Sequence, residues 1–341
     1  MFSPQFTLTA KLAQNLMQIE RLYGQLEAWQ IPRQLELNLE RNNLIKSSYI
    51  SNSIEGNPLS FAQVTNLLTG RRAPSGRDER EVHNYFALLK RLPRSVALPL
   101  RLSTALRLHE TLLTGVNDSI AGQIRDKRVI VGGYKAVQGK TRLIVKHEPP
   151  FHSRRQIENQ LRELLEWFEK DTKLSSLVRV GLFHHRYVFL HPFADGNGRT
   201  CRLLTALVLL KLGYRINRYF VLDDYYDLDR VKYSDKLNRA DQGDATAWLT
   251  YFTDGVKFSL KSALERVKQA VLYFEASERP TNWERVVLEF LTQNLQLISA
   301  DVVAKFGVSR QQAHKLLTGL VKKGLATKKG STKNSYYVPK A

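Results

Sequence analysis

The stretch His191-Pro-Phe-Ala-Asp-Gly-Asn-Gly-Arg-Thr-Cys-Arg202 decides the fold. It combines a histidine, a carboxylate, two glycines around an amide, and two arginines within twelve residues. The segments on either side, 177–190 and 201–212, carry apolar residues at helical spacing. The stretch therefore predicts a tight loop between two buried helices that enters the N-terminus of the second helix.

This predicted position favours binding of a phosphate group. The first N–H groups of a helix have no partner inside it, and the helix dipole is positive at that end. Gly196 and Gly198 remove side chains that would keep a phosphate away from the backbone. Arg199 and Arg202 are three positions apart, so both can face one anion with the forked contacts that arginine makes to phosphate oxygens.

Two further residues of the stretch indicate chemistry rather than binding alone. Asp195 offers hard oxygen ligands for Mg²⁺, which normally binds to a polyphosphate and takes few ligands from the protein. His191 titrates near neutrality and is the natural general base. The residues together predict a site that holds a Mg-nucleotide and activates an incoming hydroxyl.

The stretch matches, at every position, the motif HPFx[D/E]GNGRxxR of the Fic domain family, and a weaker likeness extends over roughly residues 50–255. The resemblance implies a helical enzyme that transfers part of a nucleotide, usually AMP from ATP, to a Ser, Thr or Tyr hydroxyl of a protein. It implies His191 as the base, Asp195 as the Mg²⁺ ligand, and Arg199 and Arg202 as contacts to the β- and γ-phosphates. The implied anion-binding nest consists of Gly196, Asn197 and Gly198, with Phe193 fixing the loop in the core.

The segment 51–58, Ser-Asn-Ser-Ile-Glu-Gly-Asn-Pro, indicates a helix end, with Gly56 at the C-terminal stop. Ser51 and Glu55 are four positions apart on one helix face. The segment is similar to the family's inhibitory motif [S/T]xxxE[G/N]. That resemblance implies that Glu55 pairs with Arg202 and takes the place of the γ-phosphate. The alternative is a helix C-cap with an exposed glutamate.

The region of about 128–148 predicts a β-hairpin, because 128–133 and 141–146 are rich in β-branched residues and the first of these segments ends in a glycine pair. The hairpin resembles the Fic flap, which would pair with an extended target segment by strand addition. A hairpin without a substrate role is the alternative. His184 and His185 are adjacent and face different ways, so we interpret them as scaffold. By resemblance, Tyr233 is the candidate wall of the adenine pocket.

Apolar spacing predicts helices through most of the remaining chain, at about 1–48 with a break at Pro32, at 59–70 with Ser60 as N-cap, and at 81–92, 102–113, 157–168 and 256–275. Residues 71–80 are predicted to be an exposed loop. Glu81 and Asn84 fit a pattern often seen early in Fic domains. Without that resemblance, we would interpret both residues as scaffold that supports the fold.

The C-terminal segment 281–341 predicts a separate winged helix-turn-helix unit. Two helices, 299–307 and 309–323, flank a tight turn with Ser309 as N-cap, and 325–338 indicates a wing. This segment holds ten Lys/Arg and three Asp/Glu, the charge balance expected of a surface that follows phosphates. Four side chains of the last helix would face the major groove: Arg310, Gln311, His314 and Lys315. Docking of a protein is the alternative.

Composition limits the partners and the compartment. The 341 residues carry a formal net charge of +20, which favours encounter with polyanions such as nucleotides or nucleic acid. The single cysteine, Cys201, cannot form an internal disulfide, so we expect a reducing, cytoplasmic location. We expect neither a signal peptide nor a membrane-spanning segment. Family members with this layout can form homodimers.

The predicted fold class is therefore mostly α: a Fic-type helical bundle with a β-hairpin flap and a C-terminal winged helix. The predicted divisions are 1–92, 93–255, 256–280 and 281–341. The predicted function is an autoinhibited protein adenylyltransferase that uses ATP and Mg²⁺, with modification of itself included. Three alternatives remain open: removal of AMP by a Glu55-aligned water, transfer of phosphate or another nucleotide, and a DNA-binding regulator that senses nucleotide.

Overall fold

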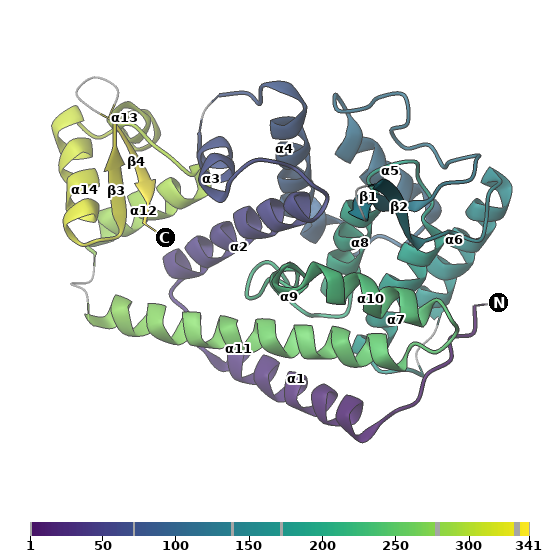
Figure 1. Ribbon diagram of the computed structural model, residues 1–341. Helices are drawn as coiled ribbons and strands as arrows, with labels where there is room; N and C mark the ends of the chain where they lie inside the picture. The colour runs from purple at the N-terminus through teal and green to yellow at the C-terminus, as the bar shows by residue number, and fades with distance from the viewer. Residues whose placement is uncertain are drawn as a thin grey trace.

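The computed structural model describes residues 2–70, 72–137, 140–170, 173–276, 280–330 and 335–340. Within these ranges the chain is mostly helical, with two small antiparallel sheets of two strands each. The mostly α fold class predicted from the sequence is confirmed. Figure 1 shows a large helical body and a smaller C-terminal unit beside one end of it.

Two long N-terminal helices frame the body. Helix α1 spans Ala10–Ala28 and α2 spans Arg33–Ile54, with Pro32 at the predicted break. Helix α1 lies along α11, Thr246–Ala276 (Figure 1). The sequence predicted a helix over 256–275, but α11 begins earlier, at Thr246. Gly255 lies inside this helix and makes room for a neighbour, since a Cβ there would lie 2.7 Å from the Tyr225 ring.

Three shorter helices follow α2: α3 (Phe61–Thr69), α4 (Gly76–Arg91) and α5 (Leu102–Leu113), with a 3-10 turn at Leu92–Ser95. Helices α3 and α4 pack against α2, and α5 packs on α4. Ser60 caps α3 through a capping box, as expected. Helix α4 begins at Gly76, so the predicted loop 71–80 is too long. Acidic residues fill the first turn of α4, and Glu79 accepts a hydrogen bond from the Ser75 N–H at 2.7 Å.

The centre of the body is the helix pair α7 (Ser176–Leu190) and α8 (Asn197–Lys211), which the sequence predicted around its central loop. Helix α6 (Arg154–Lys170) packs on α7, and the short α9 (Asp223–Leu228) and α10 (Arg230–Ala240) pack against α11. Trp248 is fully buried and donates to the Gly181 carbonyl at 2.7 Å. This packing holds α7 and α8 rigidly beneath the loop that joins them.

A hairpin of β1 (Val131–Val137) and β2 (Lys140–His147) lies beside this loop. The predicted hairpin is present, but its first strand does not end at the glycine pair. Gly132 and Gly133 pair with Val145 and Ile144, and the register shifts between Val131 and Gly132. Glycine tolerates the backbone geometry of such an irregularity, so the pair lies inside the strand.

The C-terminal unit has its own apolar core, built from α12 (Asn282–Asn294), α13 (Ser299–Phe306), α14 (Arg310–Lys322), β3 (Ala326–Lys329) and β4 (Tyr336–Pro339). Ser309 caps α14 as expected. Part of the predicted wing, 331–334, lies outside the described residues. The two predicted helices correspond to α13 and α14, and the assignment of the unit as a winged helix stays a prediction. Helix α12 packs on α2.

None of the helices in the described ranges combines the length and the apolar character needed to cross a lipid bilayer.

Candidate active site

His191 ends α7 in a left-handed backbone conformation, with φ 46° and ψ 61°, and its N–H donates to the Tyr187 carbonyl at 3.1 Å. The buried guanidinium of Arg125 holds this turn from the other side. Arg125 Nε donates to the His191 carbonyl at 2.7 Å, and the Arg125 N–H donates to the Pro192 carbonyl at 3.0 Å. The last carbonyls of a helix have no partner inside it, so Arg125 fixes the place where the catalytic loop begins.

The loop is anchored next by an aromatic stack. The Phe193 ring stacks on His109 of α5, with ring centroids 3.6 Å apart and an interplanar angle of 3°. The Gly122 N–H donates to His109 Nδ1 at 3.0 Å, so the ring proton lies on Nε2, which donates to the Asp195 carbonyl at 2.9 Å. Burial, the largest cause, lowers the pKa of His109 to about 4 and keeps this neutral tautomer in place.

Helix α8 starts with backbone donors that no side chain caps. Gly196, at φ 74°, is its N-cap. The Asn197 amide group is turned toward the loop: its Nδ2 donates to the Phe193 carbonyl at 2.8 Å, and its Oδ1 accepts from the Phe193 N–H at 2.9 Å. Of the predicted nest, Gly196, Asn197 and Gly198, the Asn197 side chain thus serves the loop, and only its backbone N–H is available for an anion.

The imidazole of His191 is held neutral at physiological pH. Burial is the largest cause that lowers its pKa to about 4, and the nearby His147 and Arg125 act in the same direction. The Glu55 carboxylate opposes them without reversing the shift. A neutral imidazole can accept a proton, so this environment suits the general-base role that the sequence indicated.

The predicted contact between the N-terminal helix and the second motif arginine is present. Arg202 donates from Nε to the Ser51 hydroxyl at 2.7 Å and from Nη2 to the Ser51 carbonyl at 2.9 Å. Nη2 also donates to Glu55 Oε1 at 2.7 Å. Burial alone lowers the pKa of Arg202, but the nearby Glu55 carboxylate is chief among the groups that outweigh it and raise the pKa. A Cβ on Gly198 would lie 2.1 Å from Glu55 Oε1, so the carboxylate covers the first turn of α8.

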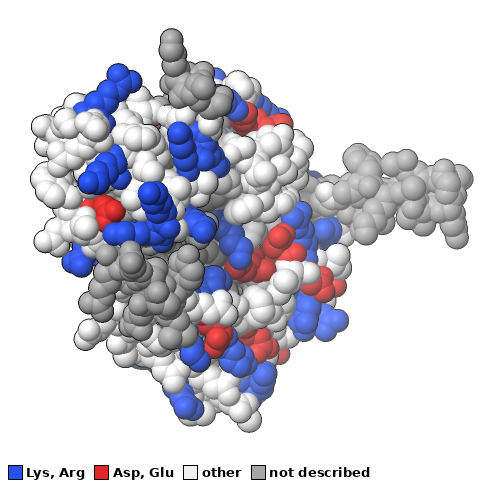
Figure 2. Space-filling model, turned by 90° about the vertical axis from the view of Figure 1, so that its left-hand side faces the viewer, with Lys and Arg blue, Asp and Glu red and all other residues white. Residues whose placement is uncertain are grey.

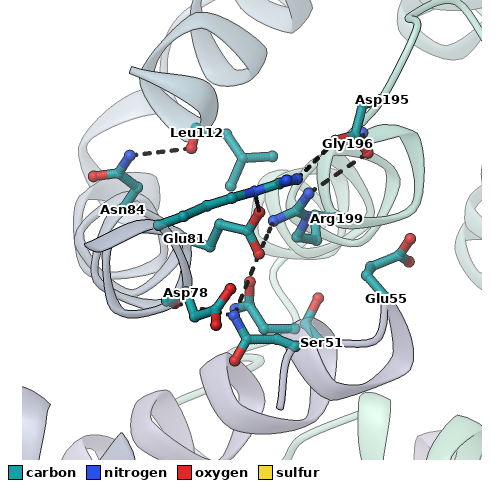
Figure 3. Close-up of polar contacts among 12 residues, drawn as sticks. Ser51, Glu55, Asp78, Glu81, Asn84, Leu112, Asp195, Gly196 and Arg199 are labelled. Atoms are coloured by element: carbon teal, nitrogen blue, oxygen red, sulfur yellow. Dashed lines mark hydrogen bonds and ion pairs between the residues drawn. The ribbon is translucent and has the colours of Figure 1, made fainter. Parts of the chain in front are cut away.

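The first motif arginine has a carboxylate partner that the sequence assigned only to the scaffold. Figure 3 shows Glu81 of α4 beside Arg199, and the distance from Glu81 Oε2 to Arg199 Nη1 is 3.0 Å. Asn57, which follows the inhibitory segment, donates to the same carboxylate at 3.3 Å. Asp195 accepts from the Gly196 N–H at 2.6 Å and lies 3.7 Å from Arg199. With its side chain 43% exposed, Asp195 remains accessible to a metal ion.

A cavity of about 210 Å³ opens beside the base. Its wall includes His191, Gly198, Arg202, Glu55 and Tyr233. The structure thus brings the predicted base, the α8 N-terminus, the glutamate of the predicted inhibitory motif and the candidate adenine-pocket tyrosine to one space. Sequence reasoning missed several residues of the lining, among them Lys146, His147 and Arg230, because they come from the hairpin and from α10 and carry no local signal.

The tyrosine is positioned by the adjacent histidines and aromatic rings. The Tyr233 hydroxyl lies 2.9 Å from His184 Nε2, and its ring stacks on Tyr226 at 4.4 Å. His184 Nδ1 lies 2.8 Å from the Thr205 hydroxyl, while His185 Nε2 lies 2.9 Å from Asp241. The two histidines therefore have different partners. His184 contacts Tyr233 and Thr205, His185 contacts Asp241, and we interpret both as scaffold.

The four residues predicted to contact DNA lie on α14, in the separate C-terminal unit. Arg310, Gln311, His314 and Lys315 are all exposed. Figure 2, which looks onto the side of the molecule that carries this unit, shows lysine and arginine side chains over this face, with acidic side chains fewest at its upper left. The Tyr337 hydroxyl of β4 lies 3.3 Å from His314 Nδ1, which ties the hairpin to the helix.

The residues of the cavity fit a Mg-nucleotide. An uncapped helix N-terminus at Gly196, a glycine at 198 and the guanidinium of Arg202 suit phosphate oxygens. The exposed carboxylate of Asp195 suits a cation such as Mg²⁺, for which water and phosphate supply most of the ligands.

Comparison with known proteins supports the same family. Residues 99–209 match the model of the Fic/DOC family. The chain is 27% identical over 258 residues to a protein adenylyltransferase Fic of Aedes aegypti, covering 72% of this chain and 48% of the relative. It is 28% identical over 263 residues to the Culex quinquefasciatus protein of the same name, with the same coverage of each. The chain thus spans about half the length of these curated relatives.

Two solved structures share the fold. A Fic family protein from Desulfovibrio desulfuricans aligns over 100% of this chain and 99% of its own, with a TM-score of 0.67 and 23% identity. Fic-1 (residues 134–508) of Caenorhabditis elegans aligns over 76% of this chain and 74% of its own, with a TM-score of 0.62 and 23% identity. The matched residues 99–209 are therefore similar to the Fic/DOC family, and the two solved structures show that the fold is shared.

Proposed function

We propose that the protein is an autoinhibited adenylyltransferase that transfers AMP from Mg-ATP to a Ser, Thr or Tyr hydroxyl of a protein. The observation that carries the proposal is the shared cavity. In it, neutral His191 and the start of α8, which no side chain caps, lie beside Arg202, and Arg202 donates a hydrogen bond to Glu55. The names of the curated relatives support the reaction class.

The chemistry follows from the positions of these residues. His191 takes the proton of the target hydroxyl, whose oxygen forms a bond to the α-phosphorus of ATP. The bond from that phosphorus to the bridging oxygen breaks, and pyrophosphate leaves. The backbone donors at Asn197 and Gly198 stabilise the negative charge, while Arg199 and Arg202 hold the β- and γ-phosphates. Mg²⁺, held by Asp195, would neutralise charge on the phosphates when bound.

Autoinhibition would act through direct competition for Arg202. The Glu55 carboxylate accepts from Nη2 at 2.7 Å, the donor that a γ-phosphate oxygen needs. A charge-assisted hydrogen bond stabilises by about 1.5–3 kcal/mol, which corresponds to a factor of roughly ten to a hundred in binding. ATP would still enter, but its phosphates would lie in an unproductive arrangement.

The flap would present the target. Hairpin β1–β2 lies beside the catalytic loop, and Val131, Lys146 and His147 belong to the cavity wall. We propose that an extended segment of the substrate protein, or of a second copy of this chain during self-modification, pairs with a hairpin edge and brings its hydroxyl to His191.

Label transfer tests the proposal. Wild type and Glu55→Gly are incubated with Mg-ATP labelled at the α- or the γ-phosphate, and labelled protein is measured. We expect label from the α-phosphate only, with roughly tenfold to hundredfold more in Glu55→Gly. His191→Ala in the Glu55→Gly background is the control and should give none. Label from the γ-phosphate would contradict AMP transfer and favour phosphate transfer.

Removal of AMP is the second candidate, because Glu55 lies close enough to His191 to influence its protonation. A carboxylate there could align a water molecule for hydrolysis of an AMP-modified protein. The same variant separates the two: Glu55→Gly should raise transfer if Glu55 inhibits and abolish removal if Glu55 is hydrolytic. A modified protein produced by Glu55→Gly serves as the substrate for the removal assay.

We also propose that the C-terminal unit binds DNA through α14, as its exposed basic residues suggest. The homodimer and the cytoplasmic location likewise stay predictions. Cys201, the single cysteine of the sequence, is buried and unpaired.

A further inference from the structure

His147, the last residue of β2, joins the flap to the catalytic core through both of its ring nitrogens. Its Nδ1 lies 2.8 Å from Asp241 Oδ2, at the end of α10. Its Nε2 lies 3.0 Å from the Phe189 carbonyl, in the last turn of α7. The side chain is only 8% exposed. Phe189 precedes the base His191 by two positions, so this contact ties the return strand of the flap directly to the base.

The chemistry of the two partners defines the protonation of the ring. A carboxylate and a backbone carbonyl only accept hydrogen bonds, so both nitrogens of His147 must donate. A neutral imidazole carries one N–H and can satisfy only one of these acceptors. The two contacts together describe an imidazolium, paired with a carboxylate and shielded from water.

The neighbouring groups are compatible with that charge. The other carboxylate oxygen of Asp241, Oδ1, lies 2.9 Å from His185 Nε2. Burial raises the pKa of Asp241, but its hydrogen bonds to the two histidines outweigh burial and lower the pKa, so the carboxylate stays ionised. The adjacent Glu148 is paired with Arg128 at 2.6 Å and does not compete for the ring.

On the side of the base, the imidazolium adds a positive charge near His191. The two rings are 6.4 Å apart at their centroids. A cation at this distance disfavours a second one, so it opposes protonation of His191. Arg125 contacts the His191 backbone from the opposite side and acts in the same sense.

We propose that His147 is a positioning residue that, as an imidazolium, fastens the flap to the loop of the catalytic base and helps to keep that base unprotonated. Its part in transfer rests on the proposed function, because the flap would present the target there. The contact of His147 with Asp241 and Phe189 does not depend on the proposed function. The contact is an ion pair with two donors, so losing the ring or the Asp241 charge should release the base of the hairpin.

The full chain, labelled with ¹⁵N at histidine, tests the protonation directly. At pH 7 we expect two protonated ring nitrogens for His147 in the wild type, assigned by their loss in His147→Gln. In Asp241→Asn we expect one protonated nitrogen, because the carboxylate that stabilises the cation is gone. A wild-type His147 with a single protonated nitrogen at pH 7 would overturn the imidazolium.

Amide hydrogen exchange tests the fastening. We expect amides of β1 and β2 to exchange about tenfold faster in His147→Gln and in Asp241→Asn, since each loses a charge-assisted hydrogen bond. His83→Gln, which changes an exposed histidine of α4, is the matched control and should leave the flap unchanged. Wild-type exchange in both variants would refute the fastening.

Label transfer in the Glu55→Gly background links the contact to activity. We expect His147→Gln to reduce labelling about tenfold at saturating ATP, because the flap would be disturbed. The KM for ATP is measured in parallel, since His147 also lines the cavity. Unchanged labelling would contradict a role in transfer. If Glu55→Gly itself takes no label, the proposed function fails, and the nitrogen signals and amide exchange still decide the fastening.

Discussion

At the scale of single residues, the site is defined by which groups stay neutral and which stay charged. Burial is the largest cause that lowers the pKa of His191 to about 4, and the nearby Arg125 acts in the same direction. Arg202 keeps its charge inside the protein because Glu55 lies 2.7 Å from it. The proposed inhibition acts through the same pair, because the carboxylate that stabilises the buried guanidinium would also keep it from a phosphate.

The pH dependence of transfer follows from the pKa of His191. The base must be unprotonated, so the rate is lost as pH falls through that pKa. Glu55 raises the pKa of His191, so Glu55→Gly should lower it further. We expect transfer by Glu55→Gly to show no His191 titration between pH 7 and 5 and to lose half its rate at about pH 4 or below. Initial rates across this range, with folding followed by circular dichroism, measure it; a midpoint near pH 6.5 would contradict the assignment.

At the scale of elements, α2 is fastened at its C-terminal end by two arginines. Arg202 binds Ser51, and Arg230 of α10 donates to the Ser53 carbonyl at 2.8 Å and to its hydroxyl at 2.9 Å. The other end of α2 packs against the C-terminal unit, where the Thr292 hydroxyl lies 3.4 Å from Asn38 Oδ1. One helix therefore carries the inhibitory glutamate and the contact to the appended unit.

Loss of one fastening should release part of the inhibition. We expect Arg230→Ala to raise self-labelling by a factor of roughly three to ten, because it removes two exposed hydrogen bonds near the helix end while the Glu55–Arg202 pair remains. Lys232→Ala, an exposed neighbour on α10, is the control. Arg230 also lines the cavity, so the KM for ATP is measured in parallel. A rate no higher than wild type at saturating ATP would refute this role.

At the scale of the whole molecule, buried neutral histidines should make the fold sensitive to acid. Burial is the largest cause that lowers the pKa of His109 to about 4, of His184 to about 3 and of His191 to about 4. The unfolded chain binds protons near pH 6.5, so the folded state loses stability below that pH, at about 1.4 kcal/mol per histidine and pH unit. Burial raises the pKa of Asp223 to about 6, which acts in the opposite direction and offsets part of the loss.

We therefore expect the free energy of unfolding to fall by about 3 kcal/mol between pH 7.5 and 5.5. Urea unfolding at the two pH values measures the difference, and His83→Gln, at an exposed position, should leave it unchanged. Equal or greater stability at pH 5.5 would show that these histidines are not neutral in the folded state.

The C-terminal unit makes its own prediction about the molecule's partners. We expect the full chain to bind duplex DNA with an affinity that falls steeply with salt, because lysine and arginine contacts release counterions. Lys315→Ala should reduce the slope of log affinity against log salt by about 1. Lys261→Ala, an exposed lysine on α11, is the control and should not change it. Absence of salt-dependent binding would instead favour a protein partner for this unit.

The sequence by itself determined the elements that depend on local signals. The run 191–202 predicted the loop and its two helices, Pro32 and Ser60 predicted boundaries, and the spacing of Ser51 and Glu55 suggested a pair that the structure brings to Arg202. These succeed because apolar periodicity, capping and motif spacing lie within a few neighbouring residues.

Only the tertiary structure decided the residues that hold the site from a distance. Arg125 behind His191, His109 beneath Phe193, Glu81 on Arg199 and His147 on Asp241 reach their partners across elements far apart in the chain. Burial and charge are properties of packed space, so a pKa or an ion pair becomes defined only when folding has removed the water between these side chains.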